Sequence, residues 1–180
     1  GGIGSTARIA VSDVAFKDAT LSEVRGVTGH EIGHYVLHHT LWGILMMSLM
    51  ALVAFRVAAS AYSSIARRLG ISASISDPQG LPALMVTVSL VSFLATPLSA
   101  TMSRHFEAEA DDYSLMHVSE PDGLSTALVK TADYRNPRPG RLEEIVFYDH
   151  PSVERRVRNA MTYKAAHSAA KPASASEPTP

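Results

Sequence analysis

Two long apolar blocks dominate the pattern of hydrophobic and polar positions along the chain. The first block runs from Leu41 to Ala66 with Arg56 as its only charged residue, and the second runs from Pro78 to Ser103 without an ionisable side chain. A helix of about 20 residues spans the ~30 Å hydrocarbon core of a bilayer, so both blocks are long enough to cross it. The pattern predicts a transmembrane hairpin with spans at about 41–66 and 80–102. The alternative is a pair of buried helices in a soluble core, which such long apolar runs disfavour.

Shorter patterns predict the elements on either side of this hairpin. Residues 8–13 alternate in polarity, as a short edge strand does. Thr20 and Glu23 form a capping-box pattern, which predicts a helix that starts there and is able to continue into the first apolar block. After the second block we expect one charged helix from Arg104 to about Val118 and a basic helix from Ser152 to about Lys164.

These elements suggest a mainly α-helical protein with a small edge sheet and an inserted hairpin. The tail of Ala, Ser and Pro after residue 164 predicts disorder. The expected organisation is an edge strand with the capped helix (1–40), the hairpin (41–103), the remainder of the folded domain (104–164) and the tail (165–180).

Composition narrows the possible chemistry. Sixteen Lys and Arg oppose seventeen Asp and Glu among 180 residues, for a net charge of −1, which argues against a strongly basic nucleic-acid-binding protein. The chain has no cysteine, so disulfides, thiolate zinc sites and thiol catalysis are excluded. Because the sequence starts with Gly and not Met, we expect a fragment that lacks an N-terminal part, with an unknown number of further spans. Nothing in the composition indicates an oligomeric state.

The strongest chemical signal is the sequence His30-Glu31-Ile32-Gly33-His34 on the capped helix. Residues four apart lie one turn apart on the same helical face, so both imidazoles can reach one ion. Glu31 lies beside that face, where a carboxylate can hold a metal-bound water and take its proton. The motif predicts one catalytic zinc ion per chain; the alternative is a helix with surface histidines.

A catalytic zinc site needs a third protein ligand. The long form of the motif fails, because Thr40 stands where another His would be needed. His38 would extend one straight helix too far for a shared ion, so we expect His38 and His39 to have interfacial or structural roles. The third ligand should therefore come from the helix after the second apolar block, where the candidates are His105, Glu107, Glu109, Asp111 and Asp112.

The segment Ser103-Arg104-His105-Phe106-Glu107-Ala108-Glu109-Ala110-Asp111 resembles the S-R-x-x-E-x-x-A-D signature of the integral-membrane zinc metalloproteases that include the CAAX prenyl proteases and the heat-shock protease HtpX. The resemblance implies that Glu107 is the third zinc ligand. Asp111 lies four residues on along the same helical face, where we expect it to be a partner for a ligating histidine or to serve local helix packing. Ala100 stands where the family usually has Asn, and Glu109 should point to the opposite face as a solvated charge.

Two further segments extend the resemblance. His150, Pro151 and Arg156 are similar to the family's C-terminal H-P-x-x-x-x-R segment, which implies that His150 or Arg156 faces the scissile carbonyl and stabilises its oxyanion. The alternatives are a loop histidine and, for Arg156, a solvated face shared with Arg155 and Arg158. Residues 8–13 are similar to the family strand on which an extended peptide substrate is added.

The combined patterns predict a membrane-embedded zinc endopeptidase of the gluzincin type. Zinc is expected on His30, His34 and Glu107, with Glu31 as general base and His150 as oxyanion donor. Its partners would be a protein or peptide substrate and the lipid bilayer, with no nucleic acid. The resemblance implies a bacterial inner-membrane protein with a cytoplasmic site, acting in protein quality control or in CAAX-type processing. The competing class is a non-catalytic membrane protein with a structural metal site.

Overall fold

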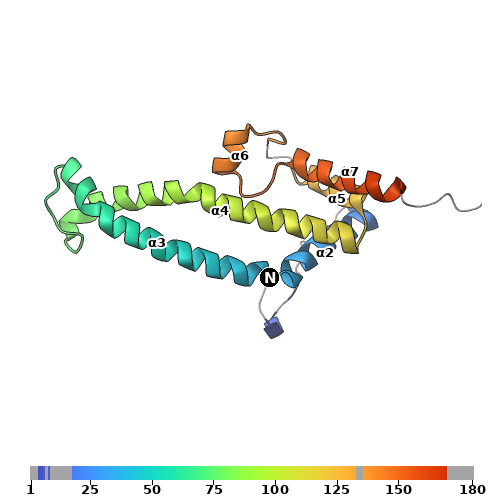
Figure 1. Ribbon diagram of the computed structural model, residues 1–180, viewed down its shortest axis with the longest axis horizontal. Coiled ribbons are helices and arrows are strands. Elements are labelled where there is room, and N and C mark those ends of the chain that lie inside the picture. The colour runs from blue at the N-terminus through green and yellow to red at the C-terminus, as the bar shows by residue number, and fades with distance from the viewer. Residues whose placement is uncertain (1–3, 7, 9–17, 133–135, 170–180) are drawn as a thin grey trace, which may run out of the picture.

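The structure, a computed structural model, describes residues 4–6, 8, 18–132 and 136–169. This part of the chain is mainly α-helical, as expected, and contains no β-strand. The edge strand expected over residues 8–13 lies, apart from Arg8, outside the described residues. Figure 1 shows an elongated molecule in which a long helical hairpin extends from a cluster of shorter helices.

The hairpin consists of helices α3 (His39–Arg68) and α4 (Leu81–His117), joined by a connection that ends in the short 3-10 helix η2 (Pro78–Gly80). The two helices run side by side (Figure 1). They meet at the far end of the hairpin through Tyr62, Ala66 and Ala83, and the Tyr62 hydroxyl donates a hydrogen bond of 3.0 Å to the carbonyl of Ala73. Both helices are long and apolar enough to cross a membrane, and most of their large apolar side chains face outward.

Helix α2 (Leu21–Val36) begins with the expected capping box. The Thr20 hydroxyl accepts a hydrogen bond from the backbone N–H of Glu23, and the Glu23 carboxylate accepts one from the backbone N–H of Thr20. The helix does not continue into the first apolar block, an extension that the sequence left open. His38 adopts a left-handed backbone with φ of 56°, a conformation that cannot propagate a right-handed helix, and α3 starts anew at His39.

Glycines let α2 approach its neighbours very closely. A Cβ atom at Gly33 would lie 3.0 Å from Cβ of Tyr113 and 3.1 Å from Cα of Ala110, both in α4. At Gly26, a Cβ atom would lie 2.9 Å from the backbone nitrogen of Leu124 in helix α5 (Pro121–Lys130). On the α4 side, the Ser114 hydroxyl donates to the carbonyl of Gly26 at 2.7 Å. Side chains at these positions would force α2 away from α4 and α5.

Helices α6 (Arg141–Phe147) and α7 (Val153–Ala169) complete the described chain. Helix α7 packs on α4 and α5 through a small core formed by Leu115, Leu124 and Ala160. Residues 165–169 continue α7, so the expectation of a tail disordered from residue 165 is wrong for them, and residues 170–180 lie outside the described part. The C-terminal helices thus cover the end of α4 that lies beside α2.

Candidate metal centre and catalytic site

Three side chains from two helices meet at one point. His30 and His34 project from α2 with their Nε2 atoms 3.1 Å apart. Glu107 of α4 places Oε2 at 3.4 Å from Nε2 of His30 and Oε1 at 3.4 Å from Nε2 of His34. In a tetrahedral zinc site with ligand distances of ~2.0–2.1 Å, neighbouring ligand atoms lie about 3.3 Å apart. The spacing and the chemical types of these three groups therefore fit one zinc ion.

The packing of α2 on α4 sets this geometry. Ala110 and Ser114 follow Glu107 by three and seven residues, so all three lie on one face of α4. Ala110 contacts Gly33 and Ser114 contacts Gly29, next to the two histidines in sequence. The contact that requires glycine on α2 is therefore the contact that brings Glu107 to His30 and His34.

Behind the three ligand candidates lies a buried ion pair. The Nδ1 atom of His30 lies 2.9 Å from Oδ1 of Asp111. Arg156 of α7 donates to both oxygens of Asp111, from Nε at 2.6 Å and from Nη2 at 2.7 Å, and its Nη1 lies 3.4 Å from Oε2 of Glu107. Only 10% of the Arg156 side chain is exposed, so it does not belong to a solvated face, whereas Arg155 and Arg158 pair with glutamates and are largely exposed.

The carboxylates of Asp111 and Glu107 stabilise a positive charge at the position of His30. Burial opposes protonation of this imidazole, but its contacts with Asp111 and Glu107 outweigh burial and raise its pKa to about 9. Burial likewise opposes ionisation of Glu107, yet the two histidines hold its pKa well below the usual range. The carboxylates stay ionised in the interior, and the centre is electrostatically suited to a cation.

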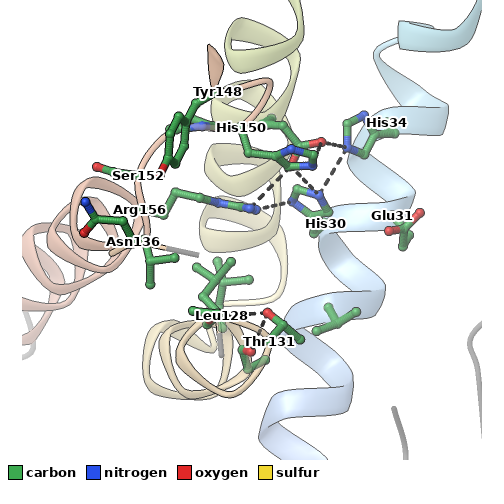
Figure 2. Close-up of a pocket in the computed structure, with 17 residues that line it drawn as sticks. His30, Glu31, His34, Leu128, Thr131, Asn136, Tyr148, His150, Ser152 and Arg156 are labelled. Carbon is green, nitrogen blue, oxygen red and sulfur yellow. Dashed lines mark hydrogen bonds and ion pairs between the residues drawn. The ribbon is translucent and has the colours of Figure 1, made fainter. Parts of the chain in front are cut away.

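A cavity of about 440 Å³ opens beside these groups, lined on one side by apolar residues of α2 and α5 and on the other by the segment that precedes α7. Glu31 and His150 both line it. Figure 2 shows the Glu31 carboxylate apart from the network that joins His30, His34, His150 and Arg156, and within the described chain it makes no hydrogen bond or ion pair. His150 lies with Nε2 at 3.5 Å from Oε1 of Glu107 and with Nδ1 at 2.8 Å from Oδ1 of Asp149.

Arg104 has a role that sequence reasoning missed. Its Nη1 donates to the carbonyls of Glu144 at 2.8 Å and of Tyr148 at 2.5 Å, which anchors the end of α6 and the chain two residues before His150. The only available signal was its place in the S-R-x-x-E signature, which does not reveal partners some forty residues away.

The other candidates for the third ligand lie elsewhere. Asp112 accepts a hydrogen bond of 2.6 Å from Asn159, and His105 is largely exposed. The Glu109 side chain is 43% exposed, in keeping with a solvated charge, but its Oε2 also lies 3.2 Å from Nε2 of His39. His39 is buried and places Nδ1 at 2.9 Å from Nδ1 of His34, so the turn at His38 folds it back against α2.

Comparisons with known proteins bear on this arrangement. A sequence model of peptidase family M48 matches residues 1–164. The chain is 30% identical over 171 residues to "Uncharacterized metalloprotease YhfN" of Bacillus subtilis, covering 88% of this chain and 38% of that protein. It is 33% identical over 136 residues to "Metalloprotease YcaL" of Escherichia coli, covering 74% of this chain and 46% of that protein. A "Protease HtpX homolog" of Desulfatibacillum aliphaticivorans is 24% identical over 166 residues, covering 83% of this chain and 53% of that protein. The chain thus spans about half the length of these relatives, or less.

The choice of Glu107 as third ligand can be tested by exchanging one carboxylate at a time. Glu107→Ala removes the only oxygen ligand of the proposed set. We expect zinc affinity to fall by about 100-fold or more, because mutating a residue that only supports a metal ligand already lowers affinity by about 10- to 100-fold. Asp112→Ala, five residues along the same helix, should leave affinity unchanged. Zinc content after dialysis against a graded series of chelator concentrations measures both variants. Loss of zinc in Asp112→Ala but not in Glu107→Ala would reassign the ligand.

Proposed function

Because the chain belongs to peptidase family M48, we propose that it forms the catalytic part of a membrane-embedded zinc endopeptidase of the HtpX type. The observation that carries this proposal is the convergence of His30, His34 and Glu107, whose ligand atoms lie within 4.8 Å of one another, with Glu31 lining the same cavity. A purely structural zinc site is closed by four protein ligands, whereas three ligands beside an open cavity are typical of catalytic zinc.

Bound to these residues, zinc supplies Lewis-acid chemistry toward a peptide carbonyl and a water molecule. Glu31 is the general base in this proposal: it takes a proton from the attacking water and passes it to the departing amine nitrogen. Its carboxylate is suited to that task because no described residue occupies its oxygens. Asp111 and Arg156 keep His30 oriented through the hydrogen bond to its Nδ1 atom.

We assign His150 to the oxyanion that develops on the scissile carbonyl. Pro151 restricts the backbone of His150 to an extended conformation, Asp149 contacts its Nδ1 atom, and its Nε2 atom lies beside the cavity, 3.5 Å from Oε1 of Glu107. Because the Asp149 carboxylate can only accept at Nδ1, Nε2 is a donor as well only when His150 is the imidazolium with both ring nitrogens protonated. In that form, a donor fixed before the reaction stabilises developing negative charge without the cost of reorienting during the step. Arg104 supports this arrangement from behind by anchoring the carbonyl of Tyr148.

The substrate in this proposal is a peptide bond of a membrane or membrane-associated protein. Support comes from the cavity, whose walls of Val27, Leu124 and Leu128 suit apolar side chains of a polypeptide. Turnover of damaged membrane proteins and CAAX-type processing both meet this description, and no described residue selects a lipidated substrate.

Membrane embedding rests on the outer surface of the hairpin. Leu52 of α3 and Leu94 of α4 are 64% and 75% exposed, and apolar residues of this kind cover both helices. The hydroxyls of Ser60, Thr87 and Thr96 each donate to the carbonyl four residues earlier, which leaves them compatible with a bilayer that offers no water. Arg56 is exposed within α3, where its long side chain could snorkel toward the membrane surface.

The role of Glu31 is tested by Glu31→Gln, which keeps the shape of the side chain and removes the base. We expect zinc content to stay at one ion per chain while cleavage of casein slows by about 10²–10⁴-fold, the usual contribution of general acid–base catalysis. Glu143→Gln, an exposed matched change in α6, should behave as wild type. Cleavage by the zinc-loaded Glu31→Gln protein at near wild-type rate would refute the mechanism.

We further propose that the zinc site lies on the cytoplasmic side of a bacterial inner membrane and that the hairpin tip lies on the far side. The numbers of positively charged residues next to the two spans are equal on both sides, with Arg25 and Arg104 on one side and Arg67 and Arg68 on the other. The proposal therefore rests on the larger basic domain that carries the site and on the family, since flanking charges alone give no orientation here.

Single cysteines introduced into this cysteine-free chain test the orientation. Ser72, in the connection at the hairpin tip, and Ser168, near the end of α7, are both exposed. In spheroplasts, an impermeant maleimide should label Ser72→Cys, and it should label Ser168→Cys only after the membrane is permeabilised. The reverse pattern would invert the topology, and labelling of both in intact spheroplasts would exclude a membrane-spanning hairpin.

A further inference from the structure

His39 is buried against the histidine pair of α2 by the turn that separates α2 from α3. The left-handed backbone of His38 redirects the chain, and the side chain of His39 is then only 5% exposed. Its ring stacks on Phe106 with centroids 4.5 Å apart and planes at 12°. One ring nitrogen faces His34 and the other faces Glu109, so burial, stacking and two polar contacts hold the imidazole in one orientation.

The contacts of His34 define where its proton must reside. Its Nε2 atom faces His30 and Glu107, and a nitrogen that binds a metal must present a lone pair. A neutral imidazole with a free lone pair on Nε2 carries its hydrogen on Nδ1. The Nδ1 atom of His34 is therefore a donor, and the group 2.9 Å away from it has to be an acceptor.

His39 satisfies this requirement through its own second partner. If Nδ1 of His39 accepts the hydrogen bond from His34, its hydrogen lies on Nε2, which is 3.2 Å from Oε2 of Glu109. A carboxylate is an acceptor only, so the donor directions agree along the whole chain from His34 through His39 to Glu109. The reversed direction would place a hydrogen on Nε2 of His34 and remove its lone pair from the metal.

We propose that His39, backed by Glu109, is a positioning residue that fixes the tautomer and ring orientation of His34 for zinc binding. The two histidines of α2 would thus be oriented in different ways. His30 contacts the carboxylate of Asp111 directly, whereas His34 contacts His39, which in turn contacts the carboxylate of Glu109. This inference rests on the proposed zinc site and adds two residues to it, neither of which touches the reacting atoms.

Four variants test the proposal in the full-length, detergent-solubilised protein. His39→Leu keeps the apolar packing and removes the acceptor, and zinc affinity measured by competition with a chromophoric chelator should fall about 10- to 100-fold, as for other partners of metal ligands. His39→Asn places an amide oxygen near the former Nδ1 atom, so its affinity should lie within about threefold of wild type. His39→Gln carries its amide farther out, toward Glu109, and should resemble His39→Leu. His105→Leu, which removes the exposed contact of Glu109, is the control and should bind as wild type.

A second readout separates positioning from a general loss of structure. Cobalt(II) loaded into the site in place of zinc reports ligand geometry through its visible absorption, and the spectrum should change in His39→Leu and His39→Gln but not in His39→Asn. The polar pair Asn and Gln keeps the test decisive even if His39→Leu fails to fold. Equal zinc affinity in wild type, His39→Asn and His39→Gln would overturn the inference and leave the zinc site standing. A wild-type protein that binds no zinc would overturn the proposed function itself.

Discussion

Three ligands from two helices can share one ion only if the helix axes come very close, and the close packing of α2 on α4 is the constraint on which the rest of this structure depends. Gly29 and Gly33 remove the side chains that would separate the helices. The same contact aligns Glu107 with the two histidines and Asp111 with Nδ1 of His30. Because α4 is also the second helix of the hairpin, the proposed metal centre lies at the base of the segment that we place in the membrane.

Charged side chains from elements far apart in the sequence balance one another's charge around the proposed metal centre. Asp111 and Glu107 bring two negative charges into the interior, and Arg156 from α7 compensates them through three contacts. A buried carboxylate is tolerated only when it is paired and hydrogen-bonded. Arg104 plays a comparable part at the surface of α4, where it holds the carbonyls that precede His150. The helices around α4 thus serve mainly to hold charged and polar groups in place.

The sequence allowed the prediction of those features that depend on the spacing of residues close together in the chain. The capping box at Thr20, the two histidines one turn apart and the long apolar helices follow from residues close together in the chain. The break at His38 could not be predicted, because neither Gly nor Pro marks it and helical spacing does not show that His39 packs back against His34. The particular contacts of Arg156 with Asp111 and of Glu109 with His39 could not be derived either, because helical spacing within α7 or α4 does not show which other helix lies opposite.

The most direct measurement of the central claim is the X-ray absorption spectrum of the zinc-loaded, full-length protein at the zinc edge. We expect nitrogen and oxygen as the only directly bound atoms, at ~2.0–2.1 Å, with the multiple-scattering signature of two imidazoles per zinc, as for His30, His34 and Glu107. Three imidazoles per zinc, with His39 or His150 replacing Glu107, would contradict it. So would a shell of six oxygens, because zinc would then be bound outside this centre.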